Sequence, residues 1–352
     1  MTYIKKIQRY KTSFIFLIIL LFVLMFFVST LGTANILFKE SVIIIFSKLP
    51  LVNRYISSDG ISDSHILIVT DIRFPRILLS ALIGIALSGT GVVFQSIFKN
   101  PMADPYVLGV SSGAAFGATL AIIFGFEATF IGFSAITIMA FVFALLTTLL
   151  VYNIGSIGSR TSVVALLLAG IALSFLLSSL ISLLMTLHRE QIQKIVFWTM
   201  GSVSAASWKH VIVSCPIILV GSIFFIAFAR DLNIMLMGDE TAKNLGLEVE
   251  KSKKILLVIA SIVAASAVSV SGIIGFVGLI VPHIFRLIVG PDHRILIPFS
   301  LVGGAILMII ADTLARTLIQ PTEIPVGVIT SLFGAPFFLF LLCRNKKNNS
   351  MR

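Results

Sequence analysis

Charged residues are scarce in this sequence. They make up 12% of its 352 residues, about half the share that soluble domains usually carry. Hydrophobic residues make up 58%, and intrinsic disorder is excluded because it requires low hydrophobicity and high charge. A large part of the chain is therefore expected to face lipid.

Cysteine is almost absent as well. Cys215 and Cys343 are the two cysteines, and neither belongs to a metal-binding or disulfide spacing. His283 has no second candidate ligand nearby in the sequence. We therefore expect no metal site and no cofactor.

Basic residues exceed acidic ones, 26 against 15, but this excess does not indicate nucleic acid. The sequence lacks a stripe of Lys and Arg interleaved with aromatic residues, which a nucleic-acid-binding surface would require. Lys and Arg are instead typical of the cytoplasmic loops of membrane proteins.

Two sources of energy for transport are also missing. The phosphate-binding pattern G-x-x-x-x-G-K-[ST] does not occur. The apolar runs carry almost no ionisable residues, whereas an ion-coupled secondary transporter, which is the alternative, needs them for proton or sodium relays. Asp104 and Asp312 are the acids nearest to these runs, and both are expected near helix ends. A transporter of this composition would need a separate subunit to supply the energy for transport.

Ten apolar stretches approach the roughly 20 residues that a membrane-spanning helix needs. The first follows a basic N-terminus and lacks a convincing cleavage site, so we interpret it as a retained helix rather than a signal peptide. No soluble domain fits between the stretches, and residues 1–352 are expected to form one all-α transmembrane domain. The predicted spans are residues 14–31, 77–98, 107–126, 130–152, 162–187, 211–229, 255–270, 273–289, 295–314 and 325–343.

Ten spans place both termini on the same side of the membrane. If that side is the cytoplasm, cytoplasmic segments hold 17 of the 26 basic residues and outer segments hold 9. This bias is the one that cytoplasmic loops show, so both termini are expected to be cytoplasmic. Arg73, Arg76 and Arg316 depart from the bias, because they lie near the outer ends of predicted helices.

These arginines allow two interpretations. Pro75 suits the first turn of a helix, and Arg73 and Arg76, three residues apart, lie on one face of it. Their side chains could reach the membrane interface, or they could contact an acidic outer partner. Asp312 and Arg316 are four residues apart, so they can pair on one helix face.

Residues 109–113 match the hydrolase pattern G-x-S-x-G, which would make an intramembrane enzyme with Ser111 or Ser112 as nucleophile. That elbow requires a preceding strand and a His and acid partner, and neither is expected here. The small residues at 88, 89 and 91 favour close helix packing instead.

Two further stretches carry information. Asp239 and Glu240 could open a short helix that Gly246 ends, as a solvated connector or as a docking helix for a cytoplasmic partner. Residues 272–286 contain three glycines at a spacing of three and then Pro282, which predicts a helix with a weak or broken interior.

Taken together, these motifs resemble the FecCD family, the permeases of ABC importers for iron–siderophore complexes, haem and vitamin B12. The resemblance covers residues 70–342. The matching stretches are residues 73–76, 100–113, 238–246, 278–286, 323–327 and 334–336.

The resemblance implies the architecture of a type II importer permease in the cell membrane. Its partners would be a second permease subunit in a homo- or heterodimer, cytoplasmic ATP-binding subunits, an extracytoplasmic substrate-binding protein and membrane lipid. ATP hydrolysis would belong to the separate ATPase. An iron–siderophore complex is the expected substrate, with haem or vitamin B12 as alternatives.

The resemblance also assigns residues to sites. Docking of the binding protein would fall to Arg73, Arg76 and Arg316. The ATPase-coupling loop would comprise Gly238, Asp239, Glu240, Ala242, Leu245 and Gly246. The translocation pathway would include Ala169, Gly170, Asn100 and Pro101.

Overall fold

The computed structural model describes residues 3–32, 34, 36–48, 60–125, 129–130, 133–157 and 160–349. Nearly all of them are helical, and the two short antiparallel hairpins are β1–β2, where Thr129 pairs with Ser134, and β3–β4, where Ser156 pairs with Thr161. In the first half of the chain the elements are α1 (Tyr3–Thr30), α2 (Phe38–Ser47), α3 (Asp63–Leu67), η1 (Ile68–Arg73), α4 (Phe74–Ile97), η2 (Pro105–Leu108), α5 (Val110–Ile123), β1 (Thr129–Phe130), β2 (Phe133–Ser134), α6 (Ala135–Gly155), β3 (Ser156–Ile157) and β4 (Arg160–Thr161).

The second half is helical throughout its elements. They are α7 (Val163–Leu187), η3 (Arg189–Gln191), α8 (Ile192–Thr199), α9 (Trp208–Ala227), α10 (Ala229–Leu236), α11 (Asp239–Asn244), α12 (Val249–Ser271), α13 (Val277–Val289), α14 (His293–Thr317) and α15 (Val326–Asn349).

Each of the ten predicted spans falls on a helix. Seven helices among the described residues are long and apolar enough to cross a bilayer, and three shorter apolar helices, Val110–Ile123, Val277–Val289 and Val326–Phe340, occupy the other predicted positions. The second span differs most, because α3, η1 and α4 run on from one another and the helix begins at Asp63. The third is shorter than predicted, since η2 precedes α5.

Short polar residues set several helix starts. Ser134 accepts a hydrogen bond from the Ile136 amide at the start of α6, at 3.2 Å. Ser162 does the same for α7, and Asp292 for α14. Each satisfies one amide that would otherwise be unpaired in the first turn of a helix.

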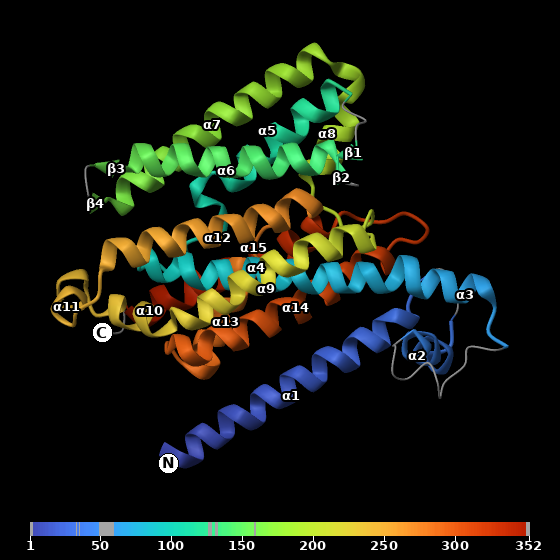
Figure 1. The fold of residues 1–352 in the computed structure, drawn as a ribbon, viewed down its shortest axis with the longest axis horizontal. Helices are drawn as coiled ribbons and strands as arrows, with labels where there is room; N and C mark the ends of the chain where they lie inside the picture. Colours follow the sequence, from blue (N-terminus) through green and yellow to red (C-terminus); the bar gives the residue numbers. More distant parts are fainter. Residues whose placement is uncertain are drawn as a thin grey trace.

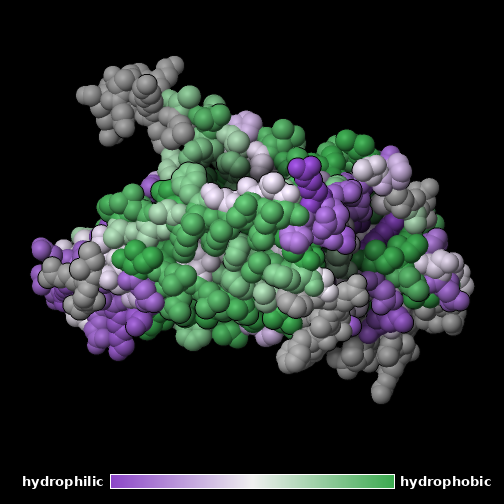
Figure 2. All heavy atoms as spheres, turned by 90° about the horizontal axis from the view of Figure 1, so that it is seen from above, coloured by the Kyte–Doolittle hydropathy of each residue, from purple (hydrophilic) through white to green (hydrophobic). Residues whose placement is uncertain are grey.

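The helices run between two polar ends. In Figure 1, α11, the β3–β4 hairpin and both chain termini lie at one end, whereas α2, α3, α8 and the β1–β2 hairpin lie at the other. We call these the inner and the outer end, following the orientation that the basic residues predict. Figure 2 shows a broad hydrophobic belt between hydrophilic surfaces at the two ends. An apolar belt between two polar ends is the surface expected of a protein that crosses a membrane.

Helix α4 occupies the centre of the molecule and packs against α14, α12, α13 and α9. Two close approaches depend on glycine. A Cβ on Gly84 would overlap the Gly304 backbone, and one on Gly91 would overlap the Gly278 carbonyl. The packing interpretation of the small residues in α4 is therefore confirmed. The helix predicted over residues 272–286 is shorter instead of broken inside: residues 272–276, with two of its three glycines, lie between α12 and α13, and α13 continues through Pro282.

Candidate functional site: an outer arginine cluster and an inner helix

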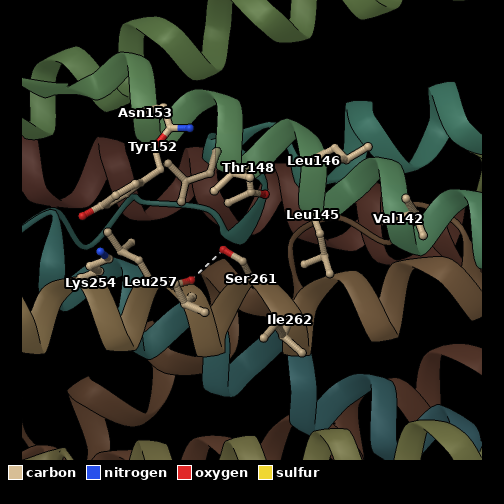
Figure 3. A pocket seen from close by; sticks show the side chains of 13 residues that line it. Val142, Leu145, Leu146, Thr148, Tyr152, Asn153, Lys254, Leu257, Ser261 and Ile262 are labelled. Carbon is tan, nitrogen blue, oxygen red and sulfur yellow. Dashed lines mark hydrogen bonds between the residues drawn. The ribbon is translucent and has the colours of Figure 1, made fainter.

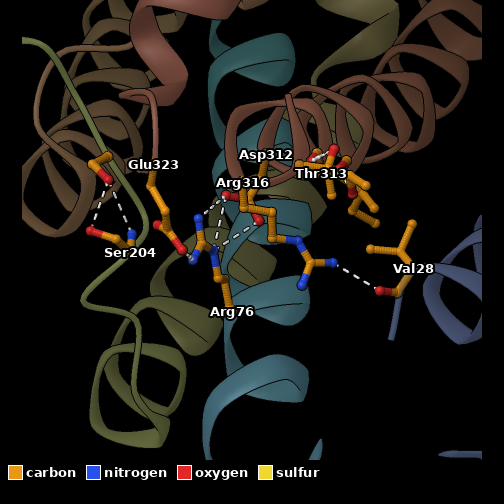
Figure 4. Close-up of polar contacts among 10 residues, drawn as sticks. Val28, Arg76, Ser204, Asp312, Thr313, Arg316 and Glu323 are labelled. Carbon is orange, nitrogen blue, oxygen red and sulfur yellow. Dashed lines mark hydrogen bonds and ion pairs between the residues drawn. The ribbon is translucent and has the colours of Figure 1, made fainter. Parts of the chain in front are cut away.

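The predicted docking arginines gather at the outer end with two acids. We call Arg73, Arg76, Asp312, Arg316 and Glu323 the outer arginine cluster. Figure 4 shows Arg76 between Asp312 and Glu323, with Arg316 beside them. Arg73 ends η1, Arg76 lies in the first turn of α4, and Asp312 and Arg316 lie in the last turns of α14. The packing of α4 along α14 brings together residues that are more than 200 positions apart.

Arg76 is the centre of this cluster. Its Nε lies 3.0 and 3.1 Å from the two carboxylate oxygens of Asp312, and its Nη2 lies 2.8 Å from Oδ1. Its Nη1 also donates to both oxygens of Glu323, at 2.9 and 3.0 Å. Arg76 and Asp312 are 7% and 2% exposed, whereas the Glu323 side chain is 41% exposed. One buried guanidinium thus binds two carboxylates, of which one reaches the surface.

The other two arginines bind the end of α1. Arg73 donates to the carbonyls of Ser29 and Thr30 at 2.8 and 3.0 Å, and Arg316 donates to that of Val28 at 2.8 Å. The last carbonyls of a helix have no partner within it, and cations there also oppose the negative end of the helix dipole. Both side chains are buried, so neither reaches the membrane interface. Arg73 and Arg316 therefore fasten α1 to the rest of the bundle.

The expected pair between Asp312 and Arg316 is wrong. The Asp312 carboxylate on α14 binds Arg76 of α4 instead, and the Arg316 guanidinium donates to the Val28 carbonyl of α1. Its Nε is buried and has no hydrogen-bond partner. Tertiary contact with a second helix outweighs the weak pairing of residues four apart.

At the inner end, α11 forms as predicted between two glycines. Gly238 and Gly246 have φ angles of 110° and 82°, conformations that favour glycine, and they bracket Asp239–Asn244. Ala242 is fully buried and anchors the helix, whereas Glu240 and Leu245 are exposed.

Asp239 has a different role from its neighbour. Its carboxylate pairs with Lys99 at 2.8 Å and with Lys253 at 2.5 Å, which ties α11 to the end of α4 and to α12. Burial opposes ionisation, but the bonds and charges of Lys253 and Lys99 hold the pKa of Asp239 below its usual value. Asp239 thus positions the helix, and Glu240 and Leu245 form the surface that it offers.

The residues expected in the pathway lie in two places: Ala169 and Gly170 belong to α7, and Asn100 and Pro101 directly follow Lys99, which binds Asp239. Gly170 in α7 is buried, and a Cβ there would overlap the Val107 carbonyl of η2, so it allows close packing. Ala169 beside it is half-buried, while Asn100 and Pro101 are exposed in the segment after α4. The Asn100 side chain accepts a hydrogen bond from the Met102 amide at 2.9 Å.

The hydrolase pattern lies in the wrong context for an elbow. Residues Pro105–Leu108 before it form the helical turn η2, and α5 starts at Val110. The strand that positions a hydrolase nucleophile is therefore replaced by a helix, and Ser111 and Ser112 lie half-buried on α5.

Sequence reasoning missed one polar cluster near the inner end. The buried His293 donates a hydrogen bond from Nδ1 to the side-chain oxygen of Asn233 at 2.7 Å, and its Nε2 contacts the Ser96 hydroxyl. Asn233 also donates to Asp292 at 2.7 Å. These contacts join α10, which leads to α11, to α14 and α4. The signal available in the sequence was a single histidine beside an N-cap aspartate, which carries no information on its partners.

The fold and the two ends define a multi-pass transport protein of the inner membrane. The model of the FecCD transport family matches residues 9–344, and the chain belongs to this family of ABC importer permeases. A cobalamin import system permease protein, BtuC of Halobacterium salinarum, is 45% identical over 283 residues, which are 80% of this chain and 75% of the relative. The hemin transport system permease protein HmuU of Yersinia pestis is 38% identical over 337 residues, covering 95% and 96%.

A solved structure shows the same fold. It is an inward-facing structure assigned to the metal-chelate type of ABC transporters, with a TM-score of 0.81 and 32% identity. The match covers 95% of this chain and 99% of that one. The sequence-based assignment to the FecCD family and to an all-α membrane fold is therefore confirmed.

Proposed function

We propose that this chain forms the membrane pathway of an ABC importer for an iron–siderophore complex, together with a second permease subunit. The relatives named for cobalamin and hemin and the metal-chelate type of the solved structure all indicate a bulky metal complex. Haem and cobalamin are the alternative substrates. Both chain termini and α11 would face the cytoplasm, and the outer arginine cluster would face a substrate-binding protein.

The observation that carries this proposal is the construction of α11. The ion pairs of Asp239 and the buried Ala242 hold this short helix against the inner end of the helix bundle. Glu240 and Leu245 are left exposed at the tip. Leu245 is 60% exposed and Met237 before the helix is 67% exposed, although both are apolar. Exposed apolar side chains on a rigid tip are typical of a surface that a partner covers. The ATPase subunit is the partner that the family requires.

The coupling role is tested with the complete transporter in proteoliposomes. We expect Leu245→Arg and Glu240→Arg to lower co-purification of the ATPase and ATP-dependent uptake at least tenfold, as for central residues of an interface. Lys243→Gln is the matched control, since it is exposed on the same helix. Full ATPase binding by both charge-introducing variants would disprove the assignment of α11. Uptake by the chain alone, driven by an ion gradient, would disprove the importer class.

The substrate is tested in the same proteoliposomes with the cognate binding protein. We expect ATP-dependent uptake of a ferric siderophore and no comparable uptake of haem or cobalamin. Uptake of haem or cobalamin in its place would assign the chain to that substrate and would leave the permease role intact.

The outer arginine cluster would be the docking surface for the binding protein. The three arginines outnumber the two acids of the cluster, and Glu323 is its half-exposed member. An acidic residue of the binding protein would compete with Glu323 for Arg76, so Glu323→Gln should raise the affinity for the binding protein up to about fivefold at low salt. Glu190→Gln is the control, because Glu190 is an exposed acid near His188 rather than Arg76. Weaker binding in the Glu323 variant would refute the competition.

A further inference from the structure

An apolar groove of about 450 Å³ lies between α6 and α12. Figure 3 shows the side chains of the two helices facing one another across it. The hydroxyls in the groove are bonded within their own helices, Thr148 to the Ala144 carbonyl and Ser261 to the Leu257 carbonyl. Its walls are formed mainly by Val142, Leu145, Leu146, Leu257, Val258 and Ile262.

One end of the groove is polar. Tyr152, Asn153 and Lys254 line it there, and in Figure 3 the Tyr152 hydroxyl and the Lys254 amine lie at the same end of the groove. This is the inner end of the molecule, because α6 leads directly into the β3–β4 hairpin and α12 follows α11. The groove thus runs from the hydrophobic belt to a basic residue at the inner boundary.

Among the described residues, Lys254 is the lysine of residues 251–254 that forms no ion pair. Lys251 pairs with Glu248 at 3.2 Å, and Lys253 pairs with Asp239. Lys254 is exposed, and among the described residues no carboxylate lies within ion-pair distance of it. A positive charge at the boundary of a membrane domain is therefore left for an external anion.

We propose that this groove binds an anionic phospholipid of the inner leaflet. An acyl chain would lie along the apolar wall, and the phosphate would accept hydrogen bonds from Lys254 and the Tyr152 hydroxyl, which lie together in Figure 3. Basic pockets between helices on the cytoplasmic side of membrane proteins are suited to acidic headgroups. The inference depends on the proposed orientation but not on the transported substrate.

The headgroup half of the proposal is tested by native mass spectrometry of the full-length chain in its transporter complex. The delipidated complex is titrated with phosphatidylglycerol or phosphatidylcholine of equal chain length. We expect retention of phosphatidylglycerol to exceed that of phosphatidylcholine and to fall about fivefold in Lys254→Gln, the loss expected for one lysine near an anionic surface. Lys251→Gln, one turn away on α12, should retain the wild-type preference. An unchanged preference in Lys254→Gln would overturn the assignment.

The acyl-chain half is tested by filling the groove. Val258 is 50% exposed on its wall, and Val258→Trp should reduce retention of both lipids. Val220→Trp on α9, where the valine is 53% exposed outside the groove, should reduce neither. Equal thermal unfolding of both variants confirms that they fold. If Val258→Trp separates the permease subunits and leaves lipid retention unchanged, a second copy of the chain occupies the groove and the proposal fails.

Discussion

Replacing Asp312 with Asn should cost far more stability than replacing Glu323 with Gln, although both acids bind Arg76. Asp312 is 2% exposed and meets two nitrogens of the guanidinium at 2.8–3.1 Å. Its neutralisation leaves buried positive charge without its main counter-ion, and breaking such a pair costs about 3–5 kcal/mol. Glu323 still binds Arg76 in this variant, so we expect about 3 kcal/mol. Because the Glu323 side chain is 41% exposed, its own neutralisation should cost no more than about 1 kcal/mol.

The assay is equilibrium unfolding of the purified chain in mild detergent, titrated with a denaturing detergent and followed by circular dichroism. If the unfolding transitions of the two variants have the same slope, the difference between their midpoints reports the difference in stability. The double variant is informative, because two acids that share one guanidinium should not contribute additively. An Asp312→Asn protein within about 0.5 kcal/mol of wild type would refute the assignment of Asp312 as the buried counter-ion of Arg76.

Two further predictions concern the inner end and the centre of the bundle. The pKa of Asp239 is lowered, so its ion pairs stabilise the folded chain above about pH 4 and are lost only when the pH falls further and the carboxylate is protonated. Asp239→Asn should therefore weaken ATPase co-purification equally throughout the range of about pH 5 to 8. A loss confined to the acidic end of this range would contradict the reasoning. Gly91→Ala forces the Gly278 carbonyl away and should cost about 1–3 kcal/mol in the same unfolding assay. Gly275→Ala should be nearly neutral, because the nearest atom to its Cβ would be the Ser331 hydroxyl oxygen at 4.0 Å, an ordinary van der Waals contact.

The sequence was sufficient for the elements whose signals are local. The long apolar runs predict the helices, and the positions of Gly238 and Gly246 predict α11 to within a residue. The glycines of α4 predict close packing, although not which helix they approach. Pro75 was misleading as a sign of a helix start, because η1 carries the helix from Asp63 unbroken into α4 and Pro75 lies within it.

The arrangement of the outer arginine cluster could not be predicted, for a physical reason. The partners of Arg76 lie 236 and 247 residues away, and only the packing of α4 against α14 makes them neighbours. Arg73 binds backbone carbonyls, which every residue carries, so no side chain in the sequence signals its role. The three arginines and Asp312 were singled out from the sequence, but Glu323 was not, and the contacts of all five depend on the tertiary fold.

These contacts change what the outer end offers to a partner. Three guanidinium groups face two carboxylates, and the carbonyls at the end of α1 carry roughly half a negative charge between them. Most of the positive charge is thus balanced within the chain, and each arginine already has a bonded neighbour. An acidic partner would gain little from approaching Arg73 or Arg316, whose bonds hold α1 in place. It would gain most at Arg76, where the half-exposed Glu323 can be exchanged for another carboxylate without unpairing the buried Asp312.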